Sequence, residues 1–145
     1  MNTRAIDYIT EDFYESLSFQ DEEIPDLDTV RSLFYADGLL INNSYNQPIT
    51  FTAETFTRAM ETQIAAGKLL QFVQRELYSK TEIFGKVAQR VSVYEYSFDD
   101  QELDNLPKGV NYIQFVQVDD NWLITSMIWN DENGNFRVPS ELVDH

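Results

Sequence analysis

The sequence contains no cysteine and a single histidine, His145, which is its last residue. Without cysteine the chain has no disulfide, no thiolate nucleophile and no cysteine ligand for a metal. Chain ends are commonly disordered, so His145 is badly placed to serve an internal catalytic triad, an acid–base pair or a zinc site. We therefore expect neither a metal nor a cofactor, and no hydrolase of the histidine-dependent kind.

Positive charge is also scarce. Ten lysine and arginine residues stand against twenty-five aspartate and glutamate residues, which gives a net charge of −15. Such a surface repels phosphate backbones and anionic lipid headgroups, so we expect neither nucleic acid nor a membrane as a partner. No apolar run reaches the length of a membrane helix, and the N-terminal residues lack the pattern of a signal peptide. A cytoplasmic location is the resulting expectation.

The composition favours one folded domain. Hydrophobic residues make up 43% of the 145 residues and aromatic residues 14%, which is enough to bury a substantial core. No repeat or linker divides the chain. The sequence therefore predicts a single domain over 1–145, with its core at about 5–132 and a polar tail at 133–145.

Helical periodicity and capping residues predict three helices in the first half of the chain. The first spans about 3–18, where Ile6, Phe13 and Leu17 recur at helical spacing. The second begins after a cap at Asp26 or Asp28 and stops at Asp37-Gly38. The third is capped by Thr52 and ends at Gly67.

The remaining apolar segments have the composition of strands. Two short ones, 39–41 and 49–52, lie between the second and third helices, and four long antiparallel strands follow at 69–80, 82–98, 110–119 and 122–130. The turn between the last two is Asp119-Asp120-Asn121, a hairpin signal. Helices followed by a run of strands indicate an α+β fold with the helices on one face of a curved sheet.

Side chains of a strand point alternately to the two faces of the sheet. In the last hairpin, the side chains on each of the two faces are mostly apolar, so neither face is polar. If the helices cover the concave face, the convex face is left as a large apolar patch, a liability for a monomer. We therefore expect a homodimer that packs two sheets face to face. The residues assigned to this interface are Ile113, Phe115, Trp122, Ile124 and Ile128.

The segments 33–38, 85–94 and 118–129 together resemble the nuclear transport factor 2-like superfamily, whose members include SnoaL-like and ketosteroid-isomerase-like proteins. The first is similar to that family's exit from its second helix, the second to its long central strand, and the third to its closing hairpin. The resemblance covers about residues 5–132. It implies a cystatin-like cone, in which three N-terminal helices pack on the concave face of a strongly curved, mainly antiparallel sheet.

The resemblance also allows each catalytic position of the family to be compared with the residue that this sequence has there. Asn43 falls where ketosteroid isomerases have their aspartate base, and an amide cannot accept a proton at any useful pH. Gln114 falls at the family's protonated carboxylic acid, where it can still donate a hydrogen bond. Tyr14 corresponds to the helix-one tyrosine of the oxyanion hole. The carboxylates left for an alternative base are Asp37 and Glu95.

Two functional classes remain open on these grounds. The leading one is a non-catalytic, dimeric domain that encloses a small apolar molecule or serves for association. The alternative is an isomerase, dehydratase or cyclase-like enzyme acting on a hydrophobic polycyclic or polyketide-type substrate. For several of the candidate pocket residues, simple core packing is an equally good explanation. The residues assigned to the pocket are Tyr14, Asn43, Tyr112, Gln114, Met127 and Trp129.

Overall fold

The structure is a computed structural model that describes residues 2–20, 22–98 and 106–142. His145 and most of the segment between the predicted strands 82–98 and 110–119 lie outside these residues. Three helices, α1 (Arg4–Leu17), α2 (Leu27–Ser32) and α3 (Ala53–Ala65), accompany one sheet of six strands, β1 to β6. This is the α+β arrangement that the element pattern predicted.

The helices form where their apolar stripes and caps predict them. On α1, the side chains of Ile6, Phe13 and Leu17 are buried against the sheet. Asp26 caps α2 by accepting a hydrogen bond from the backbone amide of Thr29. Thr52 and Thr55 form a capping box at the start of α3, which satisfies two backbone donors that a helix otherwise leaves unpaired.

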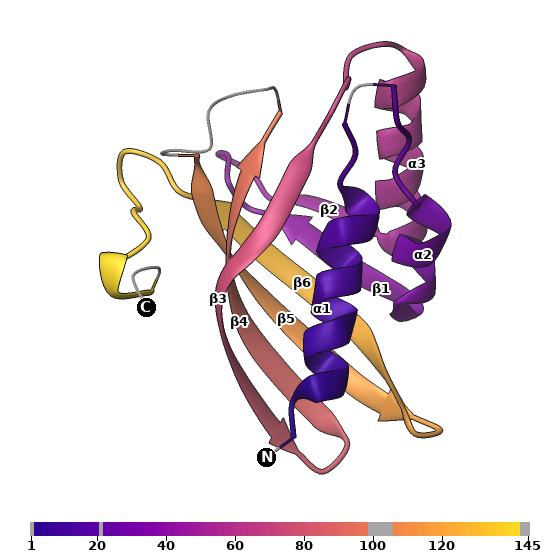
Figure 1. The fold of residues 1–145 in the computed structure, drawn as a ribbon, viewed down its shortest axis with the longest axis vertical. Coiled ribbons are helices and arrows are strands. Elements are labelled where there is room, and N and C mark those ends of the chain that lie inside the picture. The colour runs from indigo at the N-terminus through magenta and orange to yellow at the C-terminus, as the bar shows by residue number, and fades with distance from the viewer. Residues whose placement is uncertain (1, 21, 99–105, 143–145) are drawn as a thin grey trace.

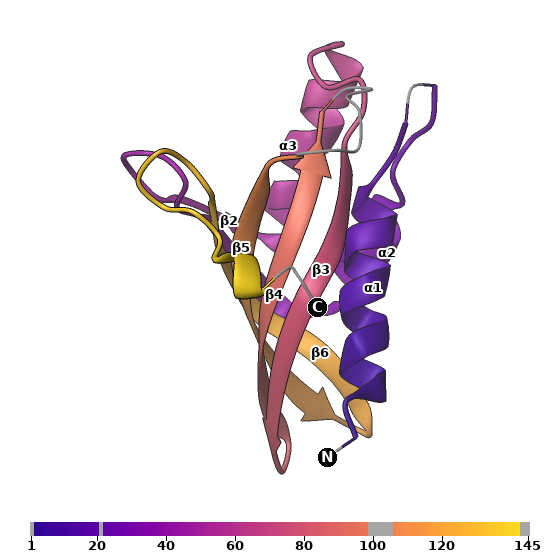
Figure 2. The same cartoon turned by 60° about the vertical axis from the view of Figure 1, so that its left-hand side comes forward.

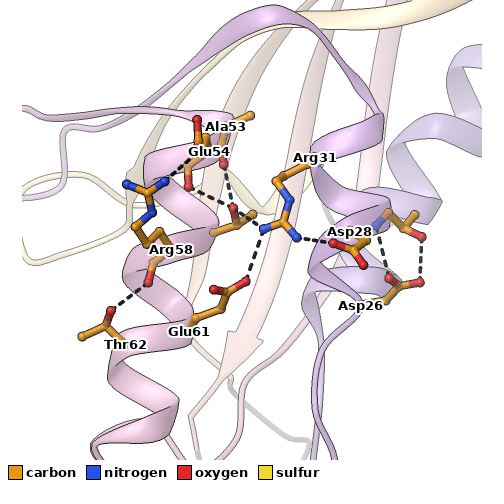
Figure 3. Close-up of polar contacts among 10 residues, drawn as sticks. Asp26, Asp28, Arg31, Ala53, Glu54, Arg58, Glu61 and Thr62 are labelled. Carbon is orange, nitrogen blue, oxygen red and sulfur yellow. Dashed lines mark hydrogen bonds and ion pairs between the residues drawn. The ribbon is translucent and has the colours of Figure 1, made fainter.

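An ion-pair network ties α2 to α3 (Figure 3). Arg31 on α2 donates from Nη1 to the Thr57 hydroxyl at 2.9 Å and to the Glu61 carboxylate at 3.3 Å, both on α3. Its other terminal nitrogen pairs with Asp28 on α2 itself. The two helices are thereby held as a unit at the edge of the cone.

The second helix is shorter than the sequence predicted. It ends at Ser32, and residues Phe34–Asn42 form strand β1, so Asp37 and Gly38 lie in a strand rather than at a helix end. The reason is an irregularity between Phe34 and Leu39, where Ala36 and Gly38 have positive φ angles. The glycine that suggests a helix cap thus shapes a bulge in the strand.

The sheet has the strand order β2-β1-β6-β5-β4-β3. All neighbouring strands are antiparallel except β1 and β6, which are parallel. The turn between β3 and β4 falls at Gly85-Lys86, four to five residues later than the predicted break, because Glu82 to Phe84 still pair with β4. The remaining strands are β2 (Ile49–Thr52), β3 (Val73–Phe84), β4 (Val87–Ser97), β5 (Lys108–Val118) and β6 (Asn121–Asp131).

The predicted orientation of β5 is wrong. Tyr112 and Gln114 are exposed on the face away from the helices, whereas Ile113 and Phe115 are 1% and 2% exposed in the core. The cause is a bulge in β6: Gln114 pairs with Ser126 but Phe115 pairs with Ile124, so one extra residue lies between them. A bulge of one residue reverses which side chains share a face beyond it.

The same bulge corrects the predicted dimer interface. Ile113, Phe115 and Ile124 are buried in the core of a single subunit, and Trp122 packs partly buried against that core. Their burial leaves them little or no surface to offer a partner. Of the five residues assigned to the interface, Ile128 alone is exposed on the open face, at 45%.

The helices all lie on one side of the curved sheet, and the C-terminal segment with its short 3-10 helix η1 (Ser140–Leu142) lies on the other (Figures 1 and 2). Between α1 and the sheet, the narrow end of the cone is filled by apolar side chains that include Ile6, Ile113 and Ile124. Among the described helices, none is both long and apolar enough to cross a membrane.

Candidate functional site

A cavity of about 250 Å³ lies at the wide end of the cone, between α1, α3 and the concave face of the sheet. Phe13 and Leu17 of α1 and Phe56 and Met60 of α3 form its helical wall. Its sheet wall comes from the ends of strands β1, β3, β4, β5 and β6. The volume lies just below the range of about 300–1,000 Å³ that is usual for ligand sites, and it suits a molecule of one or two rings. Its other lining residues include Asn42, Leu69, Tyr96, Phe98, Asn111, Met127, Trp129 and Asp131.

Aromatic side chains give this cavity fixed walls. The rings of Phe56 and Trp129 meet edge to face, with centroids 6.1 Å apart. On the opposite side, Tyr96 and Phe98 are in a similar contact at 5.8 Å. Edge-to-face pairs of this kind restrict ring rotation and leave apolar surface for flat ligands.

The most unusual polar group in the cavity wall is the amide of Asn111. This residue lies on β5 between Ser92 of β4 and Trp129 of β6. Its side chain is 3% exposed, and its Oδ1 accepts no hydrogen bond from any residue that the structure describes. A buried acceptor without a donor costs on the order of 1–3 kcal/mol, so such atoms are uncommon and often mark a site.

Behind Asn111, a chain of hydrogen bonds crosses the core to a buried ion pair. The Asn111 Nδ2 lies 3.5 Å from the Tyr14 hydroxyl, which lies 2.8 Å from the Ser92 hydroxyl. Ser92 donates to Glu76 at 2.6 Å. Glu76 in turn accepts two hydrogen bonds from Arg90, at 2.5 and 3.1 Å.

The charged groups along this chain of hydrogen bonds compensate one another. Arg90 is 4% exposed and also donates to Asp7 of α1 at 2.6 Å and to Thr81 at 2.8 Å. Burial lowers the pKa of Arg90, but hydrogen bonds and Coulombic attraction from Glu76 and Asp7 together outweigh it, so the pKa of Arg90 is raised. Burial also raises the pKa of Tyr14 above its usual range, so this hydroxyl keeps its proton.

A second polar group, the carboxylate of Asp131, lies in the cavity wall at the end of β6. Tyr94 donates to it at 2.5 Å, and its backbone amide donates to the Ser44 hydroxyl at 2.9 Å. Burial raises the pKa of the Asp131 carboxyl, and hydrogen bonds from Tyr94, Ser44 and Tyr96 only partly offset this. Burial, with the nearby Asp131 charge, also raises the pKa of Tyr96 to about 12. A carboxylate so placed could accept or return a proton.

The structure brings only part of the predicted pocket together. Met127 and Trp129 line the cavity, and Tyr14 lies directly behind Asn111. Asn43 is exposed, and its neighbour Asn42 lines the cavity instead. Tyr112 and Gln114 lie on the opposite face of the sheet.

The two carboxylates considered for catalysis are both outside the cavity. Asp37 is exposed in β1. Glu95 is buried, but it alternates with the inward-facing Tyr94 and Tyr96 and pairs with Arg75 on the neighbouring strand. The Arg75–Glu95 pair is therefore the cross-strand ion pair that β-sheet spacing predicts.

Sequence reasoning missed Asn111 and Asp131, the two polar groups that matter most. The signal for Asn111 was the alternation of Asn111, Ile113 and Phe115, which places one amide in line with two apolar core residues. Asp131 stands at the start of a polar run and reads as part of a turn. Its distinguishing contacts, from Tyr94 and Ser44, come from residues 37 and 87 positions away in the sequence.

No protein-family model matches the sequence, and no curated protein matches it. Solved structures do match. A protein of unknown function with a cystatin-like fold from Nostoc punctiforme is 13% identical with a TM-score of 0.70, over 91% of this chain and 92% of that one. An NTF2-like protein of unknown function from Pseudomonas putida is 13% identical with a TM-score of 0.67, over 90% and 88%.

A third match, from Novosphingobium aromaticivorans, is a protein proposed to be an aromatic ring hydroxylase. It is 12% identical with a TM-score of 0.67, over 90% of this chain and 88% of that one. Identities this low establish a shared fold and leave the activity open. The expectation drawn from segments 33–38, 85–94 and 118–129 is confirmed at that level: the chain has the NTF2-like, cystatin-like fold.

Proposed function

We propose that this protein binds a small, mostly apolar, ring-containing molecule in the cavity at the wide end of the cone. The observation that carries the proposal is the Asn111 amide, buried in an aromatic wall with its acceptor unpaired among the described residues. Core packing alone would favour an apolar side chain at this position, because an unpaired buried acceptor is costly. A ligand that supplies the missing donor would remove that cost.

The protein offers its own reporters for binding. Two of its three methionines, Met60 and Met127, line the cavity, and Met1 is the third. With the methionine methyl groups labelled with carbon-13, titration with indole should shift the Met60 and Met127 signals in a saturable way. Saturable shifts in neither signal would contradict the proposal.

A pair of neighbouring leucines provides a matched control. Leu69 lines the cavity, whereas Leu70 is 65% exposed beside it. Leu69→Trp should fill part of the space and abolish the shifts, and Leu70→Trp should leave them unchanged. Equal binding by both variants would place the probe elsewhere.

Association with a second copy of the chain is part of the same proposal. On the open face of the sheet, an apolar row runs across β1, β6, β5 and β4, in which each residue pairs with the next. Tyr112 and Ile128 in this row are 59% and 45% exposed, and Leu39 beside it is 44% exposed. A homodimer would cover this patch. The row consists of Ile41, Ile128, Tyr112 and Val91.

Asp131 supports a second candidate function, an enzyme that transfers protons on a hydrophobic substrate. Its carboxyl lies in the cavity and has a raised pKa caused by burial. General bases commonly have this property. The substrate would be a polycyclic or polyketide-type molecule with an acidic carbon–hydrogen bond.

The enzyme hypothesis has a direct test in the three carboxylates discussed above. Isomerisation of a bicyclic enone, the size that the cavity suits, should be lost in Asp131→Asn and retained in Asp37→Asn and Glu95→Gln. Loss in all three variants would indicate unfolding, which circular dichroism would reveal. No turnover by the folded wild-type protein would leave the binding function as the account of the site.

A further inference from the structure

The chain of hydrogen bonds behind the cavity has a direction that the buried ion pair fixes. The Glu76 carboxylate, held by Arg90, is an acceptor only, so the Ser92 hydroxyl must donate to it. Ser92 has one proton, and this bond uses it. The bond between Tyr14 and Ser92 therefore runs from the Tyr14 hydroxyl to the Ser92 oxygen.

The same reasoning orients Asn111. The Tyr14 proton points toward Ser92, so the Tyr14 oxygen can only accept from the side that faces Asn111. The Asn111 Nδ2 supplies that hydrogen, at 3.5 Å, and lies 3.7 Å from the Met127 sulfur. The amide oxygen is then turned away from Tyr14. It is buried in the cavity wall without a partner among the described residues, so a ligand in the cavity would reach it by a small displacement of the side chains that cover it.

We infer that the cavity selects ligands that donate a hydrogen bond, from an N–H or O–H group carried on an apolar ring, to the Asn111 Oδ1. The inference rests on the proposed binding function and adds to it the polarity of the recognised group. It also excludes Tyr14 as a hydrogen-bond donor to a bound carbonyl or oxyanion, because its proton is held by Ser92. A ligand presenting only an acceptor would face the Asn111 oxygen with a second acceptor, which is repulsive.

A substitution at Glu76, the end of the hydrogen-bond chain away from the cavity, can reverse the direction of these hydrogen bonds without changing a cavity residue. In a Glu76→Gln variant, Arg90 can only donate, so its Nη2 would hold the oxygen of the new amide at the position of Oε1. The amide nitrogen would take the position of Oε2, which now accepts from both Ser92 and Arg90 Nε, so the 3.1 Å bond from Nε would be lost. The nitrogen of that amide would then donate to Ser92, whose proton would turn to Tyr14, and the Tyr14 proton would turn to Asn111. The Asn111 amide would rotate to accept it, so that the cavity would now present a donor. Asp7 remains to balance the charge of Arg90 in this variant.

The test compares two bicyclic probes of nearly the same shape. Indole carries one N–H donor, and benzothiophene carries none. Calorimetric titration of the wild-type protein should show indole binding about tenfold more tightly, the size expected for satisfying one buried acceptor. Asn111→Leu and Glu76→Gln should each lose this preference. Glu82→Gln, the same change at an exposed position of β3, should keep it.

Each outcome separates the possibilities. Equal affinity of the wild-type protein for the two probes would overturn the inference and leave the binding function standing. Binding of neither probe would contradict both. If folded Asn111→Leu still prefers indole, another group recognises the donor. If folded Glu76→Gln still prefers indole, the ion pair does not set the direction of the hydrogen bonds. Thermal melts followed by circular dichroism establish that each variant is folded.

Discussion

At the scale of single residues, the Tyr94 ring closely approaches Gly109, which pairs with both Tyr94 and Asp131 across the strands. A Cβ atom on Gly109 would lie 2.2 Å from the Tyr94 hydroxyl oxygen and 2.9 Å from the backbone oxygen of Asn130. The missing side chain is what lets Tyr94 cross β5 and donate to Asp131.

Gly109→Ala should therefore destabilise the protein by about 1–3 kcal/mol, the usual cost of overpacking. Chemical unfolding in urea measures this, with Gly134→Ala as the control, because a Cβ there meets nothing within 4 Å. Equal stability of the two variants would show that Tyr94 is free to move aside.

The raised pKa of Asp131 makes a prediction about stability and pH. A carboxyl whose pKa is higher in the folded state than in the unfolded state favours folding while it is protonated. This contribution is complete below the ordinary pKa of 3.8 and is lost as the pH rises through the folded-state pKa.

Asp131→Asn has no such charge to bury. Its free energy of unfolding should therefore increase relative to that of the wild-type protein as the pH rises from about 4 to 8, because only the wild-type protein loses this contribution. Asp12→Asn, at an exposed position of α1, should show no comparable gain. A difference between Asp131→Asn and wild type that stays constant or shrinks with pH would mean that Asp131 ionises as easily in the folded protein as in the unfolded chain.

At the scale of elements, the hairpin between β5 and β6 turns on two aspartates with positive φ, 49° at Asp119 and 66° at Asp120. This is the backbone of a two-residue turn that an Asn-Gly pair fits best. The double substitution D119N/D120G, which introduces that pair, should stabilise the protein by about 1 kcal/mol. The urea midpoint of unfolding measures the change.

Gly85→Ala provides the reverse case. Gly85 has a φ of 59° and nothing within 4 Å of a Cβ, so the substitution changes only backbone strain. It should cost about 1 kcal/mol. If D119N/D120G does not raise the urea midpoint while Gly85→Ala lowers it, side-chain contacts of the aspartates must contribute to the turn.

The same hairpin shows what sequence can and cannot predict here. Its turn and both strands follow from local composition, as do α1, α3 and the cap at Thr52. The bulge near Thr125 has no local signal, yet it decides which face of β5 carries Ile113 and Phe115 and which carries Tyr112 and Gln114. The assignment of pocket and interface residues on β5 was wrong for that reason, whereas Met127 and Trp129, which follow the bulge on β6, do line the cavity.

At the scale of the whole molecule, the open face of the sheet leads to a prediction about assembly. If the row through Tyr112 and Ile128 is covered by a second copy, sedimentation should give twice the 16.9 kDa mass of one chain. Y112R/I128R should give a monomer that keeps its fold, since both side chains are exposed. Tyr8→Arg, at a 61% exposed position on α1, should remain dimeric. A wild-type monomer at micromolar concentration would contradict the prediction.

The central claim is that an aromatic cavity presents the oxygen of Asn111 to a ring-shaped donor. A crystal structure of the protein saturated with indole tests it most directly. The account predicts the indole ring between Trp129 and the α3 side chains, with its nitrogen about 2.7–3.2 Å from the Asn111 Oδ1. Indole bound outside the cavity, or bound inside it with its nitrogen turned away from Asn111, would contradict the account.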